Sequence, residues 1–300
     1  MQILPLEQIY AEGFIKDEPL FNKDFLCIPY KGKFFCIEKQ KLSVTEQKLL
    51  LTLYPNVAPL YELERKFWYQ VLFKHTRLSE KDAGEYRIIQ VQFKRMDDSI
   101  YHSWIQTMET ILPNLVDCLF VSSNQALLID KRTENYYQKE ELHGLFTALD
   151  DDFATFTQIF VGAFYPSEVD FTKIYREESR LFQEMLVENP KKYLSLSDCV
   201  LYLATSQDLT NYESLKELGK IFFAEEGMKE VIHALWKNQA NVSSTAKDLF
   251  MHRNTLLYKM EKFQQRFDLN LKELNDLLMV YLISNLKFQS NFHIDILKIF

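Results

Sequence analysis

The first 80 residues begin with a pattern of short apolar runs. Residues 25–40 hold two such runs on either side of Lys31-Gly32-Lys33. Apolar, β-branched and aromatic residues that flank a short glycine-containing connection are typical of a β-hairpin. The pattern therefore predicts a strand pair near the start of the chain.

Helical spacing follows this hairpin. Ser43 stands three residues before Glu46, a capping box that opens an amphipathic helix, and Pro55 marks where that helix ends. Pro59 opens a second helical pattern. With the hairpin, these helices predict a small α/β domain over residues 1–80.

Between residues 86 and 190 the apolar spacing switches repeatedly between a strand period of two and a helical period of about 3.6. The predicted order is strand, helix, hairpin, helix, strand, helix. The corresponding ranges are 86–94, 98–113, 116–131, 139–153, 156–165 and 171–186. This order predicts an α/β sandwich of the ferredoxin-like or split βαβ kind.

From about residue 192 every segment has helical spacing. The sequence therefore predicts an α+β protein with three domains: residues 1–80, residues 86–190, and a helical domain over residues 192–300.

Within the helical domain, residues 243–267 predict two helices joined by a tight turn at Met251-His252, with residues 228–238 as a supporting helix. This is the layout of a helix-turn-helix, whose second helix can lie in the DNA major groove. Ser243 is the expected N-cap of the first motif helix. At 100° per residue, one face of the second motif helix is apolar. That face holds Leu256, Met260, Phe263 and Phe267.

The opposite face of the second helix is polar. Asn254, Thr255 and Tyr258 lie on its first turns, where residues of such helices reach base edges. We therefore expect these three residues to read bases. The side chains expected to contact phosphates lie at the start of the first motif helix and along the second. They are Ser244, Thr245, Lys247, Arg253, Lys259 and Lys262. A solvated basic face on an ordinary helix pair is the alternative interpretation.

Charge is distributed unevenly along the chain. The net charge is −7, yet residues 228–267 hold seven Lys and Arg against three Asp and Glu. An acidic body with a basic module near its end suggests a polyanionic partner.

Other features predict a cytoplasmic protein. The chain has no stretch of 18 uncharged apolar residues and no basic-then-apolar start, so we expect neither a membrane span nor a signal peptide. The cysteines have no metal-ligand spacing, and free thiols are favoured over a Cys27–Cys36 bond. No metal site, cofactor or catalytic residue is expected.

The segment from Asn238 to Ser284 resembles the C-terminal helix-turn-helix domain of PucR/CdaR-type bacterial transcriptional regulators, and the resemblance covers residues 228–285. It is carried by Asn238, Asn241, Thr245, Ala246, Leu249, His252, Arg253, Asn254, Thr255, Leu256, Tyr258 and Lys259. Lys259 stands where the family usually has Arg, and it lacks the planar fork that makes bidentate contacts.

The middle domain is similar to the degenerate GGDEF-like domain of such regulators. An active diguanylate cyclase would need a glycine-rich acidic turn, but this chain has Ser122-Ser123-Asn124-Gln125 there. The resemblance implies a non-enzymatic regulator that binds double-stranded DNA as a homodimer and that responds to an unidentified small-molecule effector. The alternative is a ligand-sensing or protein-interaction module whose helix-turn-helix no longer binds DNA.

Overall fold

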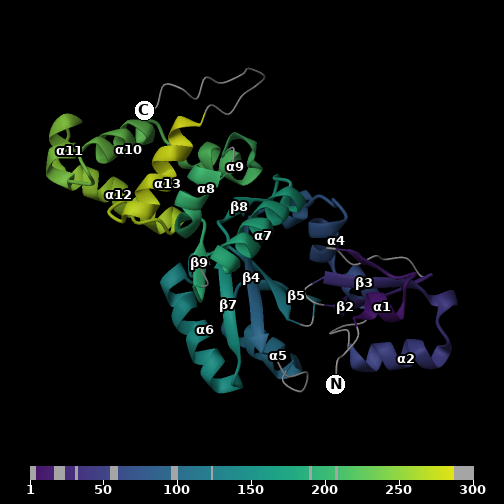
Figure 1. The fold of residues 1–300 in the computed structure, drawn as a ribbon. Coiled ribbons are helices and arrows are strands. Elements are labelled where there is room, and N and C mark those ends of the chain that lie inside the picture. The colour runs from purple at the N-terminus through teal and green to yellow at the C-terminus, as the bar shows by residue number, and fades with distance from the viewer. Residues whose placement is uncertain are drawn as a thin grey trace. The chain divides into compact units, whose positions relative to one another are not determined.

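The computed structural model describes residues 5–16, 24–30, 33–54, 60–95, 101–122, 124–188, 191–206 and 209–286 (Figure 1). Two compact units divide the chain. The first comprises residues 1–76, 89–130 and 145–159, and the second comprises 77–88, 131–144 and 160–300. Both strands and helices are present, and the predicted α+β class is confirmed.

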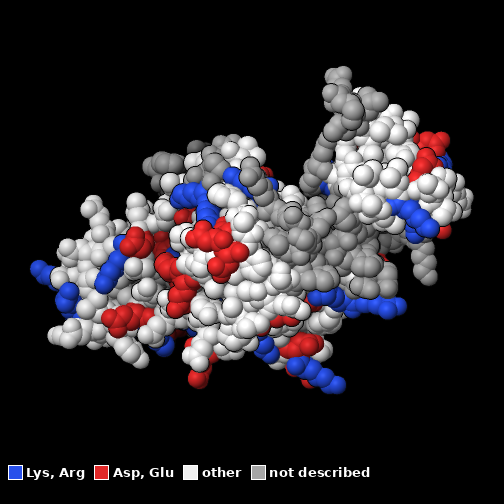
Figure 2. All heavy atoms as spheres, turned by 90° about the horizontal axis from the view of Figure 1, so that it is seen from below, with Lys and Arg blue, Asp and Glu red and all other residues white. Residues whose placement is uncertain are grey.

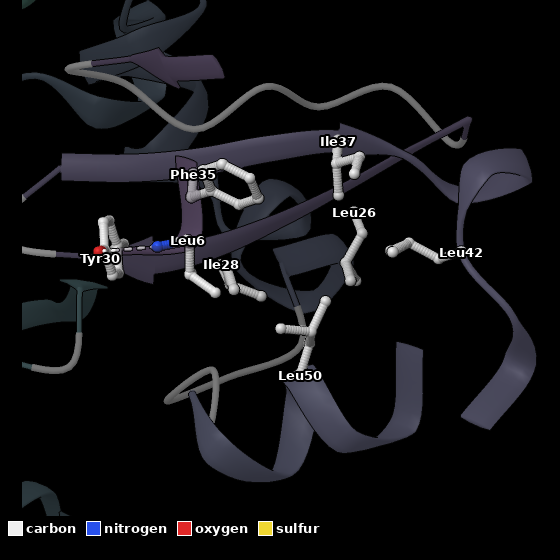
Figure 3. Packing of buried hydrophobic residues seen from close by; sticks show 8 residues of the cluster. All are labelled: Leu6, Leu26, Ile28, Tyr30, Phe35, Ile37, Leu42 and Leu50. Atoms are coloured by element: carbon white, nitrogen blue, oxygen red, sulfur yellow. Dashed lines mark hydrogen bonds between the residues drawn. The ribbon is translucent and has the colours of Figure 1, made fainter. Parts of the chain in front are cut away.

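The first unit contains a three-stranded antiparallel sheet of order β1-β3-β2. Its elements are α1 (Leu6–Ile9), β1 (Phe14–Lys16), β2 (Phe25–Tyr30), β3 (Lys33–Glu38) and α2 (Val44–Leu53). The predicted hairpin is present as β2 and β3, and Lys31 and Gly32 of its turn lie outside the described residues. Figure 3 shows Leu50 of α2 pointing toward the apolar side chains of the strands, and the hydroxyl of Tyr30 accepting the Leu6 N–H at 3.1 Å. The sheet and α2 thus share one small core.

A capping box opens α2, whereas α1 and α4 (Phe67–Phe73) begin without a side-chain cap. Ser43 accepts the Glu46 N–H and the Glu46 carboxylate accepts the Ser43 N–H, so the predicted capping box opens α2. The single helix expected after Pro59 is instead two, α3 (Leu60–Arg65) and α4, and Pro59 itself lies outside the described residues. The break falls at Lys66, which has extended backbone and whose ammonium bonds Asp117 at 2.6 Å.

A disulfide joins Cys27 and Cys36, so the expectation of free thiols is wrong for this pair. The two residues lie directly opposite each other in the β2–β3 register, with Cα atoms 4.2 Å apart. Closely spaced antiparallel pairs bring side chains near enough to bond. Cys118 and Cys199 are free and buried.

The larger sheet has the strand order β5-β6-β4-β7-β9, and β8 pairs with β4. Its elements and helices are β4 (Glu85–Arg95), α5 (Tyr101–Ile111), β5 (Leu115–Ser122), β6 (Gln125–Lys131), α6 (Lys139–Phe153), β7 (Phe156–Val161), β8 (Tyr165–Pro166), α7 (Phe171–Glu188) and β9 (Tyr193–Ser195). The predicted order of strands and helices over this stretch is present. Ser123 of the β5–β6 turn and the start of the predicted helix at 98–113 lie outside the described residues. Strand β9 is a correction, because we expected only helices after residue 192.

Six α-helices follow β9 in the described part of the chain. They are α8 (Val200–Ser206), α9 (Glu213–Phe222), α10 (Met228–Lys237), α11 (Val242–Asp248), α12 (Arg253–Phe267) and α13 (Leu274–Asn285). Helix α13 packs against α9 and α10, and Trp236 stacks on Tyr281 with ring centroids 4.7 Å apart. This packing supports α11 and α12, which carry the predicted motif.

The surface carries both signs of charge. Figure 2 shows Lys and Arg intermingled with Asp and Glu on one face, with several acidic side chains gathered together. Among the described residues, no helix has the length and apolar character needed to cross a membrane.

Candidate nucleic-acid interface

Side-chain caps fix both helices of the motif. Asn241, and not the predicted Ser243, is the N-cap of α11, and its side-chain oxygen accepts the Ser244 N–H at 3.0 Å. Both residue types cap well, and the turn places Asn241 one residue before the helix. His252 caps α12 through Nδ1, which accepts the Asn254 N–H at 3.2 Å.

The turn between the two helices has an unusual backbone. Phe250 lies there with a φ of 51°, in the left-handed region that favours glycine, and its side chain is 98% exposed. The ring gains almost nothing from packing within the described chain. Phe250 is therefore a strained position that is not compensated by burial.

The interior of the motif follows the predicted apolar face. Leu256, Met260 and Phe263 of α12 are buried, as is Ala246 where α11 approaches its neighbours. Thr245 is also fully buried, and its hydroxyl has no hydrogen-bond partner among the described residues. A hydroxyl in that position cannot reach a phosphate group, so the structure removes Thr245 from the predicted phosphate contacts.

The outer face of α12 presents the predicted base-reading residues. Asn254, Thr255 and Tyr258 are exposed, and Tyr258 retains 66% of its accessible surface. Their side chains make no hydrogen bond with any described residue. Donor and acceptor groups of this kind can pair with base edges.

The predicted phosphate contacts fall into two groups. Ser244, Lys247 and Arg253 are exposed, and neither cation makes an ion pair with a described residue. Lys259 and Lys262 instead share the carboxylate of Glu225, at 3.2 and 3.1 Å. These two hydrogen bonds, the one from Lys262 first, lower the pKa of Glu225 below its ordinary value.

Asp248, the last residue of α11, pairs with α10 and makes no ion pair with Arg253. The Asp248 carboxylate accepts bonds from Lys237 and Asn238, both at 2.9 Å, and these bonds lower its pKa. Asp248 therefore ties α11 to the end of α10 and leaves Arg253 exposed to solvent.

The C-terminal end of α12 is held by side chains from distant parts of the same unit. The Gln265 carbonyl accepts hydrogen bonds from Arg132 at 3.0 Å and from the Tyr136 hydroxyl at 2.8 Å. Arg266 makes a bidentate ion pair with Glu85. These contacts fix the last turn of the helix at several points.

Asp268 completes this attachment. It ends α12 in the left-handed conformation, and its carboxylate accepts the N–H of Lys139, the first residue of α6, at 2.6 Å. Burial raises the pKa of Asp268 to about 6. The carboxylate lies at the N-terminus of α6, where the Lys139 N–H opposes this rise of the pKa but does not cancel it.

The side chains that hold the C-terminal end of α12 are not predicted by the sequence pattern. Glu85, Arg132, Tyr136 and Lys139 are 129 to 181 residues away from their partners on α12. No helical or strand period connects positions so far apart, so the local pattern carries no signal for them.

Comparison with known proteins agrees with this geometry. Residues 228–285 match the PucR C-terminal helix-turn-helix domain. The match spans α10 to α13 and confirms the resemblance stated from the sequence. The C-terminal helices are therefore a helix-turn-helix domain of the PucR type, which belongs to transcriptional regulators.

Two relatives are similar over nearly the whole chain. One is the "Leucine-rich protein" of Streptococcus dysgalactiae subsp. equisimilis, 26% identical over 93% of this chain and 98% of its own length. The other is the "Uncharacterized protein YxkF" of Bacillus subtilis (strain 168), 22% identical over 92% of this chain and 95% of its own. A solved structure, a regulator of polyketide synthase expression from Bifidobacterium adolescentis, aligns with 76% of this chain and 92% of its own. Its identity is 13% and its TM-score 0.40.

Proposed function

We propose that this protein is a sequence-specific transcriptional regulator that binds double-stranded DNA through α11 and α12. The observation that supports this most is the outer face of α12, where Asn254, Thr255 and Tyr258 are exposed within a helix-turn-helix of the PucR type. These side chains would read base edges in the major groove. Ser244, Lys247 and Arg253 would contact the backbone phosphates.

The rest of the chain would serve assembly and signalling. Residues 1–80 and 86–190 are proposed as domains for dimerisation or sensing, with residues 192–300 as the DNA-binding domain. A cytoplasmic homodimer would present two copies of α12 to half-sites about 34 Å apart. We propose no catalytic role, because the β5–β6 turn has Ser122 and Asn124 hydrogen-bonded to each other where a cyclase would need carboxylates.

A salt titration tests DNA binding. Fluorescence anisotropy of the full chain with duplex DNA from upstream of its own gene should give a steep fall in affinity as salt increases. Each phosphate contact contributes about −0.9 to the logarithmic slope. The double variant Asn254→Ala/Tyr258→Ala should lose preference for that duplex over unrelated DNA, by about 10-fold or more.

Two further variants distinguish a phosphate contact from a base contact and control for an unrelated change in the same domain. Lys247→Gln should weaken binding to all duplexes alike, since a phosphate contact carries no sequence information. Asn275→Ala, an exposed position on α13, should bind as the unmodified chain does. If the full chain binds no duplex even at low salt, the proposal is wrong.

A second candidate function is a regulator domain that no longer binds DNA and acts through a protein or small-molecule partner. The pairing of Lys259 and Lys262 with Glu225 favours it, because both cations already have an anionic partner. A folded chain that binds no duplex at low salt would support this candidate.

A further inference from the structure

A cleft of about 510 Å³ lies beside the C-terminal half of α12, between that helix, the end of α9 and the start of α10. All three helices belong to the second unit. Asn254 and Tyr258 do not line the cleft, but Lys259 and Lys262, two of the phosphate contacts expected from the sequence, do. Its volume is within the range of about 300 to 1,000 Å³ that is typical of sites for small organic molecules.

Aromatic rings form the floor of the cleft. The ring centroids of Phe222 and Phe267 are 4.7 Å apart, and those of Phe263 and Phe267 are 4.6 Å apart. Phe222 and Phe263 are buried, whereas Phe267 is partly exposed. An apolar group that entered the cleft would cover this exposed aromatic surface.

Cations line the cleft above this floor. Lys259 and Lys262 share the single carboxylate of Glu225, and Arg132 and Arg266 both contact the carboxylate of Glu85. Four cations therefore face two carboxylates, an excess of two positive charges in a chain whose net charge is −7. A bound anion would be attracted by this excess of positive charge.

We propose that the cleft binds a small amphipathic organic anion, one with an aromatic or hydrocarbon body and a carboxylate or phosphate head. The body would lie on Phe267, and the head would take the place of Glu225 beside Lys259 and Lys262. This consequence rests on the proposed function and on the phosphate contacts that the sequence predicts for Lys259 and Lys262: if these lysines leave Glu225 to contact DNA, a bound anion would compete with the DNA phosphates for them. Such a ligand would then lower DNA affinity, and the cleft would be the effector site.

Isothermal titration calorimetry without DNA tests the site itself. The probes are 4-phenylbutyrate and phenyl phosphate, compared with the neutral 4-phenylbutanol and with inorganic phosphate. Both amphipathic anions should bind and raise the melting temperature, since a ligand that binds the folded state stabilises it. The neutral alcohol and inorganic phosphate should bind at least about tenfold more weakly. Equal binding of either comparator, or no binding of the two anions, would overturn the proposal.

Lys262→Gln locates the site. Its side chain is 58% exposed, so the folded structure should persist, and affinity for both anions should fall severalfold. Lys237→Gln is the matched control, because Lys237 is also an exposed lysine paired with one carboxylate but lies outside the cleft. An equal loss in both variants would mean general charge screening and would overturn the assignment.

The two proposals fail separately. Anion binding by a chain that binds no DNA would leave the cleft assignment standing and remove its regulatory consequence. DNA binding by a chain that binds neither anion would leave the proposed function standing and remove the cleft.

Discussion

Asn254, Thr255 and Tyr258 on the first turns of α12 are exposed and make no side-chain hydrogen bond with a described residue. At the other end of the same helix, Arg266 and Asp268 are bound to Glu85 and to the first N–H of α6. One end is therefore available to a partner, and the other is fixed to the protein. A helix held in this way presents its exposed end without losing further conformational freedom on binding, which favours affinity.

The largest effect is expected at a buried carboxylate of α13 that bonds Lys139, the same residue whose N–H binds Asp268 at the fixed end of α12. Asp276 is 2% exposed and accepts bonds from Lys139 Nζ at 3.0 Å and from the Asn270 N–H at 2.7 Å. Asp276→Ala leaves Lys139 without its anion in a partly buried place, so the free energy of unfolding should fall by about 3 kcal/mol. Urea denaturation of the variant and the unmodified chain measures this difference in the free energy of unfolding.

Asp248→Ala is the matched control on the exposed side of the motif. This substitution also removes the aspartate of an ion pair with a lysine, Lys237, but both partners are exposed to solvent. We expect little change in the urea midpoint, because water replaces such a partner readily. Equal losses in the two variants would contradict the contrast between the buried attachment beside the end of α12 and the solvent-exposed one on α11.

The fixed end should also respond to pH. Burial raises the pKa of Asp268 from 3.8 to about 6. The folded protein therefore binds the proton of the Asp268 carboxyl more tightly than the unfolded chain does. The resulting stabilisation of the folded state is fully present below about pH 3.8. It is lost as the pH rises through about 6, by no more than about 3 kcal/mol, since one pKa unit corresponds to about 1.4 kcal/mol.

Asp268→Asn should remove this part of the pH dependence, because the amide oxygen can still accept the Lys139 N–H but does not titrate. Thermal unfolding between pH 4 and pH 8 compares the two chains. If their melting temperatures run parallel across that range, Asp268 does not titrate as described.

Near the exposed end, the turn at Phe250 should be improved by glycine. Phe250→Gly relieves the left-handed backbone and exposes no core, so it should stabilise the folded chain by about 1 kcal/mol. Denaturant unfolding measures the gain, with Phe250→Ala as the control that keeps the backbone strain. Similar stability of the Gly and Ala variants would show that the φ angle costs nothing.

Local pattern predicted much of this motif. The buried stripe of Leu256, Met260 and Phe263 follows from helical spacing, and the exposure of Asn254 and Tyr258 follows from the same wheel. The strands and helices of the larger sheet also follow from their apolar periods, because each buries one face.

What the pattern missed depends on neighbours far away in the chain. Strand β9 has three residues and is a strand because β7 lies beside it. The Cys27–Cys36 bond required the strand register, and the burial of Thr245 required the packing of α11. The attachment of α12 to Glu85 joins residues 181 positions apart. Such contacts are properties of the assembled fold and have no local period.

The weakest expected effect concerns the boundary between the two ends, where Lys259 and Lys262 share Glu225. If these lysines belong to the DNA-binding surface, Glu225 competes with the phosphates for them. Glu225→Gln should then raise DNA affinity about two- to fivefold, as expected for a solvent-exposed ion pair, and steepen the salt slope. Glu230→Gln, an exposed glutamate on α10, serves as the control for the change in net charge. An increase of the same size in both variants would reflect the overall charge of the protein. An unchanged DNA affinity in Glu225→Gln would mean that Lys259 and Lys262 do not belong to the DNA-binding surface.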